Sequence, residues 1–311
     1  MKKRFEKLVK LGVLTALAMY FVNKSIESYA SLRNLLSSHE GTYYNWKNVR
    51  IFYKKQGSGS PILLIHDLYP SSSSQEWSAI MDQLSEHHTV YALDLPGCGR
   101  SDKPQITYTN YYYVLMLTSF IQDVIKEKCD VMSTGKSGSF TLLAASIEPE
   151  LFGKLTLINP ESPSKLEAVP DTRSKVIKFL VNIPILGTSL YYLLTAENQV
   201  EEDFCERYFY NPFHVNEKLI HTYYESAHGK QGNGRYLMAS LHGNYVNNTI
   251  RFALPQLSND IHLIFGKEWD QVDNVAESYC SLNDSITCSF VEKTKMLPQL
   301  EAPEKILSLI D

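Results

Sequence analysis

The chain has 311 residues, enough for one large domain or for a core with an insertion. Its net charge of −4 and pI near 6.2 lack the basic excess that nucleic-acid binding requires. Hydrophobic residues make up 44% of the chain, which is ample for a core. The five cysteines are odd in number and show no C-x-x-C spacing, which favours buried free thiols over disulfide bridges.

The first 24 residues are predicted to be a membrane anchor. Basic residues from Lys2 to Lys10 precede an apolar run, Leu11 to Val22, and no cleavage site follows that run. Because the run is short for a span of roughly 20 residues, a basic helix lying on the membrane surface stays open as the alternative. The basic flank predicts the globular part on the outer side of the membrane, whereas the unpaired cysteines favour a reducing side.

Residues 25–48 are predicted to be a polar linker, with the first core strand beginning at Val49. Short apolar runs then alternate with helix-like runs. The apolar runs are 62–66, 88–93, 131–132 and 154–158. This alternation predicts a parallel sheet covered by helices, the α/β class.

The stretch from Val131 to Phe140 has the pattern of a catalytic turn. A short strand runs into Gly135-Lys136-Ser137-Gly138-Ser139, and a helix-like run follows at once. Strand, tight turn and helix are the context of a nucleophile elbow, which exposes a serine hydroxyl above a sheet. The usual pattern is G-x-S-x-G, with Ser139 here in place of the last glycine. We therefore predict Ser137 as the nucleophile, although serine among glycines is also typical of an ordinary turn.

A second interpretation of the same residues is a nucleotide site. Gly135-Lys136-Ser137 is also the end of a P-loop, whose backbone N–H groups wrap phosphates. That motif needs a glycine where Asp130 stands, and an acidic side chain there would repel phosphate. The P-loop is therefore the weaker interpretation.

Three stretches resemble the α/β-hydrolase family. Leu63 to Leu68 (Leu-Leu-Ile-His-Asp-Leu) is similar to the family's His-Gly oxyanion strand. Asp94 to Pro104 (Asp-Leu-Pro-Gly-Cys-Gly-Arg-Ser-Asp-Lys-Pro) matches the loop after the next strand almost letter for letter, and the elbow follows at the right distance. Ile261–Gly266 resembles the strand that carries the triad acid, and Leu297–Pro303 resembles the closing segment.

The resemblance covers about residues 45–311 and implies a fold. It implies a mostly parallel central sheet covered by helices, with a helical cap inserted after the sixth strand. The expected divisions are core residues 49–162, cap residues 163–255 and core residues 256–311. The cap sequence is rich in Tyr and Phe, which are expected to pack within the lid or to line an apolar substrate pocket.

The resemblance also implies site residues. The backbone N–H groups of Leu68 and Gly138 would form the oxyanion hole, with His66 in a structural role. The acid would follow Gly266, where Asp270 is the first choice and Glu268 the second. No cofactor or metal is implied.

The position of the triad base is the departure from the family. The family's histidine stands just before the closing segment, and this chain has Met296 there. A thioether takes no proton at neutral pH, and losing a triad member costs roughly 10⁴–10⁶ in kcat. A cap histidine could substitute. The cap histidines are His214, His221, His228 and His242.

The expected function follows from these parts. The resemblance implies a serine hydrolase of acyl esters or similar small apolar substrates, with its activity in doubt. The alternative is a non-catalytic protein at the membrane that keeps the pocket for a ligand or partner. Fold alone does not decide between them.

Overall fold

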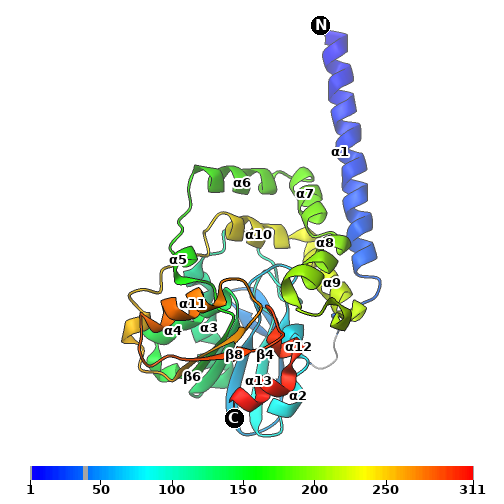
Figure 1. Cartoon of the computed structure of the whole chain (residues 1–311). Coiled ribbons are helices and arrows are strands. Elements are labelled where there is room, and N and C mark those ends of the chain that lie inside the picture. Colours follow the sequence, from blue (N-terminus) through cyan, green and yellow to red (C-terminus); the bar gives the residue numbers. More distant parts are fainter. Residues whose placement is uncertain (1, 38–40, 311) are drawn as a thin grey trace.

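The structure is a computed structural model that describes residues 2–37 and 41–310 (Figure 1). At its centre lies an eight-stranded sheet in the order β1-β2-β4-β3-β5-β6-β7-β8. The strands are β1 (Thr42–Trp46), β2 (Val49–Gln56), β3 (Ser60–Ile65), β4 (His88–Leu93), β5 (Cys129–Thr134), β6 (Phe152–Ile158), β7 (Ile261–Gly266) and β8 (Thr287–Val291). β2 runs antiparallel to both of its neighbours, and the other pairings are parallel.

Helices cover both faces of this sheet. The α-helices are α1 (Lys2–Ala30), α2 (Met81–Leu84), α3 (Asn110–Phe120), α4 (Ser137–Ile147), α5 (Pro163–Leu166), α6 (Thr172–Asn182), α7 (Leu186–Leu194), α8 (Glu197–Glu202), α9 (Glu217–Gly232), α10 (Gly234–His242), α11 (Val272–Cys280), α12 (Pro298–Glu301) and α13 (Pro303–Ile310). Leu63 and Ile65 of β3 pack in the large core with α3 and α4, whereas Ile62 and Leu64 pack in a second core with α2 and α13. A strand buried on both faces reads as a continuous apolar run, as β3 does.

The helical cap lies between β6 and β7, where the sequence predicts it. Helices α5 to α10 occupy residues 163–242 and pack above one end of the sheet (Figure 1). Several of the cap's aromatic side chains are buried in a cluster with Leu297 of the closing segment. They are Phe204, Tyr208, Phe209 and Tyr223. Much of the aromatic content of the cap therefore holds the lid together and onto the core.

The N-terminal region differs from the prediction at its boundaries. α1 continues past residue 24 to Ala30, and β1 begins at Thr42, so the predicted linker 25–48 is largely structured. Residues 38–40 of that linker lie outside the described residues. The linker prediction was wrong because the last turns of α1 pack on the cap: Asn23 and Ala30 are buried.

The predicted anchor is not confirmed as a membrane span. Within residues 2–37 and 41–310, no single helix combines the length and the apolarity that a membrane span requires. One pair of helical segments, Thr172–Asn182 and Leu186–Tyr208, meets those criteria together but is bent by 106°.

Candidate functional site

The order of the strands determines where the candidate site lies. β3 and β5 are parallel neighbours, with Ile65 opposite Ser133, while the chain leaves β3 for β4 on the other side. At such a reversal the loops that follow the two strands diverge and leave a crevice at their carboxyl ends. The loop His66–Leu68 and the turn at Gly135 therefore lie together at the edge where α/β proteins bind their ligands.

The apex of the strand-to-helix turn is Gly135. β5 ends at Thr134, Gly135 has φ +57°, and Lys136 already has helical angles of −62° and −24°. A nucleophile elbow holds its nucleophile at this sharp turn between strand and helix. Glycine adopts this left-handed conformation without steric cost and brings no functional group.

Ser137 lies elsewhere than predicted. It is the first residue of α4, is fully buried, and donates its hydroxyl hydrogen bond to the carbonyl oxygen of His66 at 2.6 Å. The prediction that Ser137 stands at the apex was wrong because β5 runs to Thr134. In the elbow pattern the structure places Ser133 and Ser137 at the two small-residue positions and Gly135 between them. The length of the strand was the signal that could have shown this register.

The carboxylate of Asp67 fills the space beside the apex. A Cβ atom on Gly135 would lie 2.3 Å from Asp67 Oδ1, closer than two non-bonded atoms can be. The same Oδ1 accepts hydrogen bonds from the N–H of Leu68 and the N–H of Lys136, both at 2.8 Å. These N–H groups come from the residue after the apex and from the loop after β3, the two sources of the oxyanion hole in this type of site. A carboxylate oxygen of the chain itself thus occupies the oxyanion hole.

Only one of the two predicted oxyanion donors points at the site. Leu68 supplies one of the converging N–H groups. Gly138 does not, because its N–H donates to the carbonyl oxygen of Gly135 at 3.2 Å within the turn. The second donor is Lys136. The phosphate-binding interpretation also loses support, since Asp67 already occupies the Lys136 N–H and would repel a phosphate.

Two buried side chains hold the backbone of Asp67 in position by hydrogen bonds. His66 donates through Nδ1 to the carbonyl oxygen of Asp67 at 2.7 Å, because its Nε2 accepts the N–H of Leu95 at 2.9 Å. Burial lowers the pKa of His66 to about 4, so the ring is neutral and structural. Glu76 accepts the N–H of Asp67 at 2.9 Å and the hydroxyl of Tyr223, on cap helix α9, at 3.0 Å. Burial raises the pKa of Glu76 to about 8.

A cavity of about 550 Å³ opens above Asp67 between the core and the cap. Met296 and Asp270 both line it, so the structure brings the predicted base position and the first-choice acid to the same cavity as the turn. Asp270 is exposed, and Met296 is half-buried. Glu268 does not line the cavity, and its carboxylate accepts the N–H of Thr294 at 3.1 Å.

Charged side chains of both signs line this cavity. Lys136 donates to Glu161 at 2.5 Å, and Lys165 lies 3.3 Å from the same carboxylate. Arg207 pairs with Asp203 at 2.9 Å while lining the cavity. Burial raises the pKa of the Asp67 carboxyl, although Lys136 and the two N–H groups oppose that shift. The cavity is thus a polar one, with aromatic and aliphatic walls from Tyr69, Tyr208, Leu241, Trp269 and Val275.

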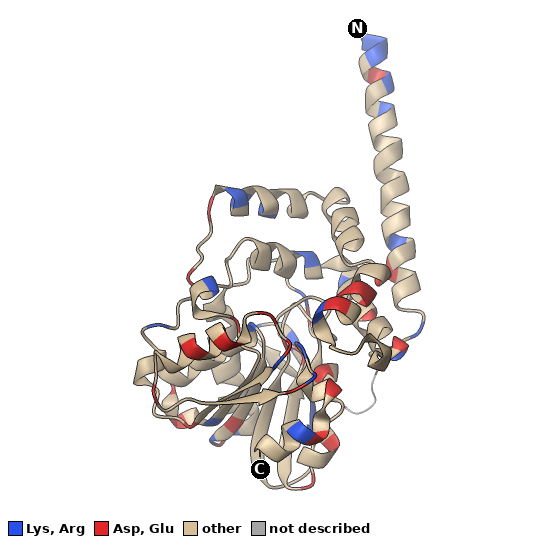
Figure 2. Cartoon of the chain, viewed as in Figure 1, with Lys and Arg blue, Asp and Glu red and all other residues tan. Residues whose placement is uncertain are grey.

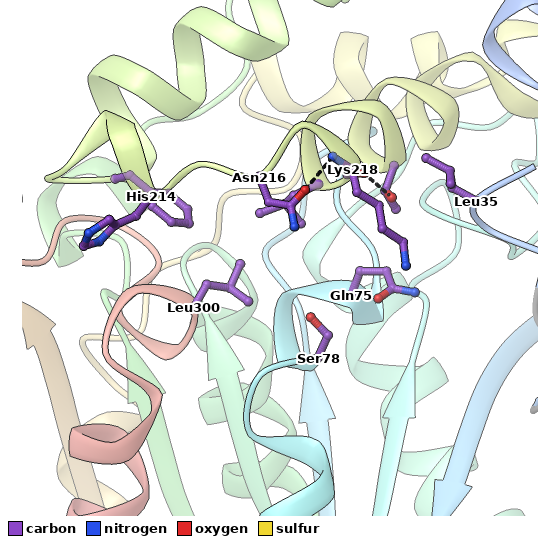
Figure 3. A pocket seen from close by; sticks show the side chains of 10 residues that line it. Leu35, Gln75, Ser78, His214, Asn216, Lys218 and Leu300 are labelled. Carbon is purple, nitrogen blue, oxygen red and sulfur yellow. Dashed lines mark hydrogen bonds between the residues drawn. The ribbon is translucent and has the colours of Figure 1, made fainter. Parts of the chain in front are cut away.

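Of the four cap histidines, all of which the structure describes, only His242 lines this cavity. His221 pairs with Glu197 at 2.7 Å, and His228 stacks on Tyr192 with ring centroids 4.6 Å apart. His214 lines a second cavity of about 350 Å³ between cap and core. Figure 3 shows that Asn216 in that cavity accepts the N–H of Lys218, a helix-capping bond of 2.8 Å. None of the predicted catalytic or oxyanion residues lines the second cavity.

The loop that matches the family almost letter for letter has a structural role. Asp94 pairs with Arg100 through bonds of 2.7 Å and 3.0 Å, and it also accepts the N–H of Ser74 at 2.8 Å. Arg100 lowers the pKa of the buried Asp94 to about 2. Gly99, at φ +45°, makes room for this carboxylate, because a Cβ there would lie 2.3 Å from it. The Asp94–Arg100 ion pair of this loop therefore holds the core closed below the site.

Sequence comparison agrees with this architecture. A family model described as the alpha/beta hydrolase fold matches residues 60–180. The chain has the α/β-hydrolase fold, and residues 60–180 are similar in sequence to that family. The match covers the oxyanion strand, the Asp94 loop and the elbow, the three stretches that carry the resemblance.

Curated relatives match over part of the chain. The chain is 27% identical over 124 residues to a 2-hydroxy-6-oxo-6-(2'-aminophenyl)hexa-2,4-dienoic acid hydrolase of Metapseudomonas resinovorans, covering 39% of this chain and 43% of that protein. It is 28% identical over 110 residues to a soluble epoxide hydrolase of Corynebacterium sp., covering 35% and 38%. It is 30% identical over 125 residues to the human mesoderm-specific transcript homolog protein, covering 38% and 35%. The matches thus span less than half of each relative.

Solved structures share the fold over most of the chain. A bacterial membrane phospholipase A has a TM-score of 0.69 at 20% identity, covering 100% of this chain and 97% of that one. An epoxide hydrolase has a TM-score of 0.71 at 18% identity, covering 87% and 96%. At such identities the likeness shows the fold alone.

Proposed function

We propose that this chain is a non-catalytic α/β-hydrolase-fold protein that binds a small charged ligand in the cavity above β3 and β5. One observation carries the proposal. The apex of the elbow is Gly135, and the Asp67 carboxylate occupies the oxyanion hole beside it.

The site lacks parts that acyl transfer requires. The reaction needs a nucleophile at the apex, a base to take its proton, and empty N–H donors for the developing oxyanion. Gly135 has no side chain, and Met296 stands at the position where the family has its base. An anion already sits on the donors and would repel a second one. Three independent parts of the mechanism are therefore missing in the same site.

The cavity lining supports a charged ligand over an apolar ester. Lys136, Lys165 and Arg207 lie around it together with Asp67, Glu161 and Asp270. Charges arranged in this way orient a ligand with complementary polar groups, while the aromatic walls contact its apolar part. The apolar ester substrate implied by the resemblance fits this lining less well.

Hydrolysis is the competing function, and it is supported by the similarity to two proteins that are named as hydrolases. Activity with aryl esters and labelling by a fluorophosphonate decide between the two. We expect neither in the native chain above the rate of the Ser137→Ala variant. Turnover that depends on a serine would overturn the non-catalytic proposal.

The fluorescence of Trp269 reports ligand binding in the cavity. Trp269 lines the cavity, whereas Trp46 and Trp77 are buried elsewhere in the fold. We expect saturable changes of tryptophan emission when small dicarboxylates or amino acids that fit are added. The change should be absent in Trp269→Phe and weakened in Arg207→Ala. A screen in which no charged compound gives a saturable signal would contradict the proposed ligand class.

We also propose that α1 holds the protein at a membrane, with the globular part on the outer side. The support is its basic N-terminal end, the uncharged run Leu11–Val22, and the exposure of those side chains. At 1.5 Å per residue the run is about 18 Å long, short of the roughly 30 Å hydrocarbon core. That length favours shallow insertion from the interface. The test is flotation of the full chain with phosphatidylcholine–phosphatidylglycerol vesicles, which Leu14→Glu with Leu17→Glu should abolish.

A further inference from the structure

Exposed apolar side chains gather on two helices of the cap. On α6 they are Val176, Phe179 and Leu180, and on α7 they are Leu186, Leu190 and Leu193. These positions are three or four residues apart and so share one face of each helix. Phe179 is 68% exposed and Leu193 is 70% exposed. A soluble surface scatters such residues singly, whereas a row of them marks an interaction site.

The exposed half of α1 joins this surface. Figure 1 shows α1 running past α6 and α7 and projecting beyond them. A shallow groove connects the helices, lined by α1 residues between Leu8 and Met19 and by Pro184, Ile185 and Leu186. The groove thus joins the apolar side chains of α1 to the start of α7.

Specific polar contacts hold α1 and α7 in one arrangement. Asn23 donates to the carbonyl oxygen of Ile185 at 3.1 Å and accepts the hydroxyl of Ser189 at 2.9 Å. Ile185 has φ +65°, a strained conformation for a β-branched residue, and it precedes the first residue of α7. A surrounding structure that maintains such strain fixes the position of the helix. A surface that engages α1 therefore meets α7 at the same time.

Basic residues outnumber acidic ones on this surface. Residues 172–195 contain no acidic residue, and two of their three basic residues, Arg173 and Lys175, are exposed, whereas Lys178 is half-buried and donates to Thr107. The free end of α1 carries basic residues from Lys2 to Lys10, with Glu6 the one acidic residue among them (Figure 2). Basic side chains beside an apolar helix face are the pattern of helices that lie in the interface of an anionic bilayer.

We infer that the outward faces of α6 and α7 form a second membrane contact, which docks the cap on the anionic bilayer that α1 enters. The inference rests on the membrane proposal for α1. A lipid surface suits these faces better than a protein partner does. The apolar rows lie on two successive helices, the second of which borders the groove on α1, and basic residues lie on α6 and at the free end of α1.

Tryptophan substitution tests the contact in the full chain. The Phe179→Trp variant places a reporter on α6, and Phe252→Trp places one at a matched site, 74% exposed, in the segment between α10 and β7. Both are bound to vesicles of phosphatidylcholine and phosphatidylglycerol whose phosphatidylcholine chains are brominated. We expect strong additional quenching for Phe179→Trp and none for Phe252→Trp, because bromine quenches tryptophan only within the bilayer.

Binding variants give the second readout. Leu193→Glu should lower the vesicle partition coefficient about tenfold or more, since one buried leucine contributes roughly that factor. Phe252→Glu should change it less than about twofold, the scale of an exposed residue that stays in water. Both variants remain on exposed positions, and circular dichroism checks that they fold.

The outcomes separate this inference from the proposal beneath it. A chain that floats with the vesicles while Phe179→Trp stays unquenched overturns the second contact and leaves the α1 proposal standing. A chain that does not float overturns both. Equal loss of binding in Leu193→Glu and Phe252→Glu contradicts the inference. Binding of the α6–α7 surface to a protein in place of lipid would appear as the first of these outcomes.

Discussion

Two buried aspartates at the ends of neighbouring strands have opposite electrostatics. Asp94 follows β4 and faces the Arg100 guanidinium, which lowers its pKa to about 2. Asp67 follows β3 and faces two backbone N–H groups with Lys136 nearby, and burial raises its pKa. One carboxylate closes a structural ion pair, and the other sits where catalysis would need an empty site. The structural ion pair of the frame is thus kept, while the position of the oxyanion hole is filled by a carboxylate.

The largest expected effect on stability comes from breaking the buried ion pair between Asp94 and Arg100. Asp94→Asn leaves Arg100 charged and buried without a counter-ion, which should cost about 3–5 kcal/mol of unfolding free energy. Urea unfolding followed by circular dichroism measures it. The control is Asp102→Asn, whose partners Arg50 and Lys230 are partly exposed, and which should cost less than about 1 kcal/mol. Equal losses of unfolding free energy in the two variants would show that the buried ion pair contributes no more to stability than the partly exposed one.

A side chain at the apex tests the crowding between the turn and Asp67. Gly135→Ala adds a Cβ at a left-handed φ and against the Asp67 carboxylate, so we expect a loss of about 2 kcal/mol. Gly138→Ala is the matched control, because its Cβ would meet neighbours no closer than 3.4 Å. In an Asp67→Gly background the cost of Gly135→Ala should fall by about half, leaving only the backbone strain. Additive effects in that cycle would mean that the carboxylate does not occupy the space.

The pH dependence of stability should differ in sign between the two aspartates. The folded pKa of Asp94 lies below its unfolded value near 3.8, so its contribution is present above pH 4 and lost as pH falls toward 2. The folded pKa of Asp67 is raised, so stability is lost as pH rises above about 4. Asp67→Asn should therefore gain stability relative to the native chain as pH rises from 4 to 7. A constant difference from pH 3 to 7 would contradict the assigned shift.

The smallest effect concerns Ser137. Ser137→Ala removes the hydroxyl donor to the His66 carbonyl and should cost about 1 kcal/mol of stability. It should leave any esterase rate unchanged, since this hydroxyl is buried away from the cavity. A drop in turnover without a loss of stability would return Ser137 to a catalytic role.

The sequence predicted the frame better than the site. The alternating apolar runs predicted the sheet, because buried strands have a local sequence pattern, and the family resemblance predicted the cap and the position of Met296 before the closing segment. The apex was mispredicted because small residues occur at 133, 135, 137, 138 and 139, so the pattern fits in two registers. Only the length of β5 decides between them. The role of Asp67 needs the pairing of β3 with β5, which no local pattern shows.

The central claim is that Gly135 stands in the nucleophile's place and Asp67 in the oxyanion hole. Fluorophosphonate labelling with the adduct mapped by mass spectrometry tests it most directly. The native chain and Met296→His alone should form no adduct. The triple variant Asp67→Gly, Gly135→Ser, Met296→His should be labelled at residue 135, because it has a nucleophile, a base and open N–H donors. An adduct on Ser137 in the native chain would contradict the account.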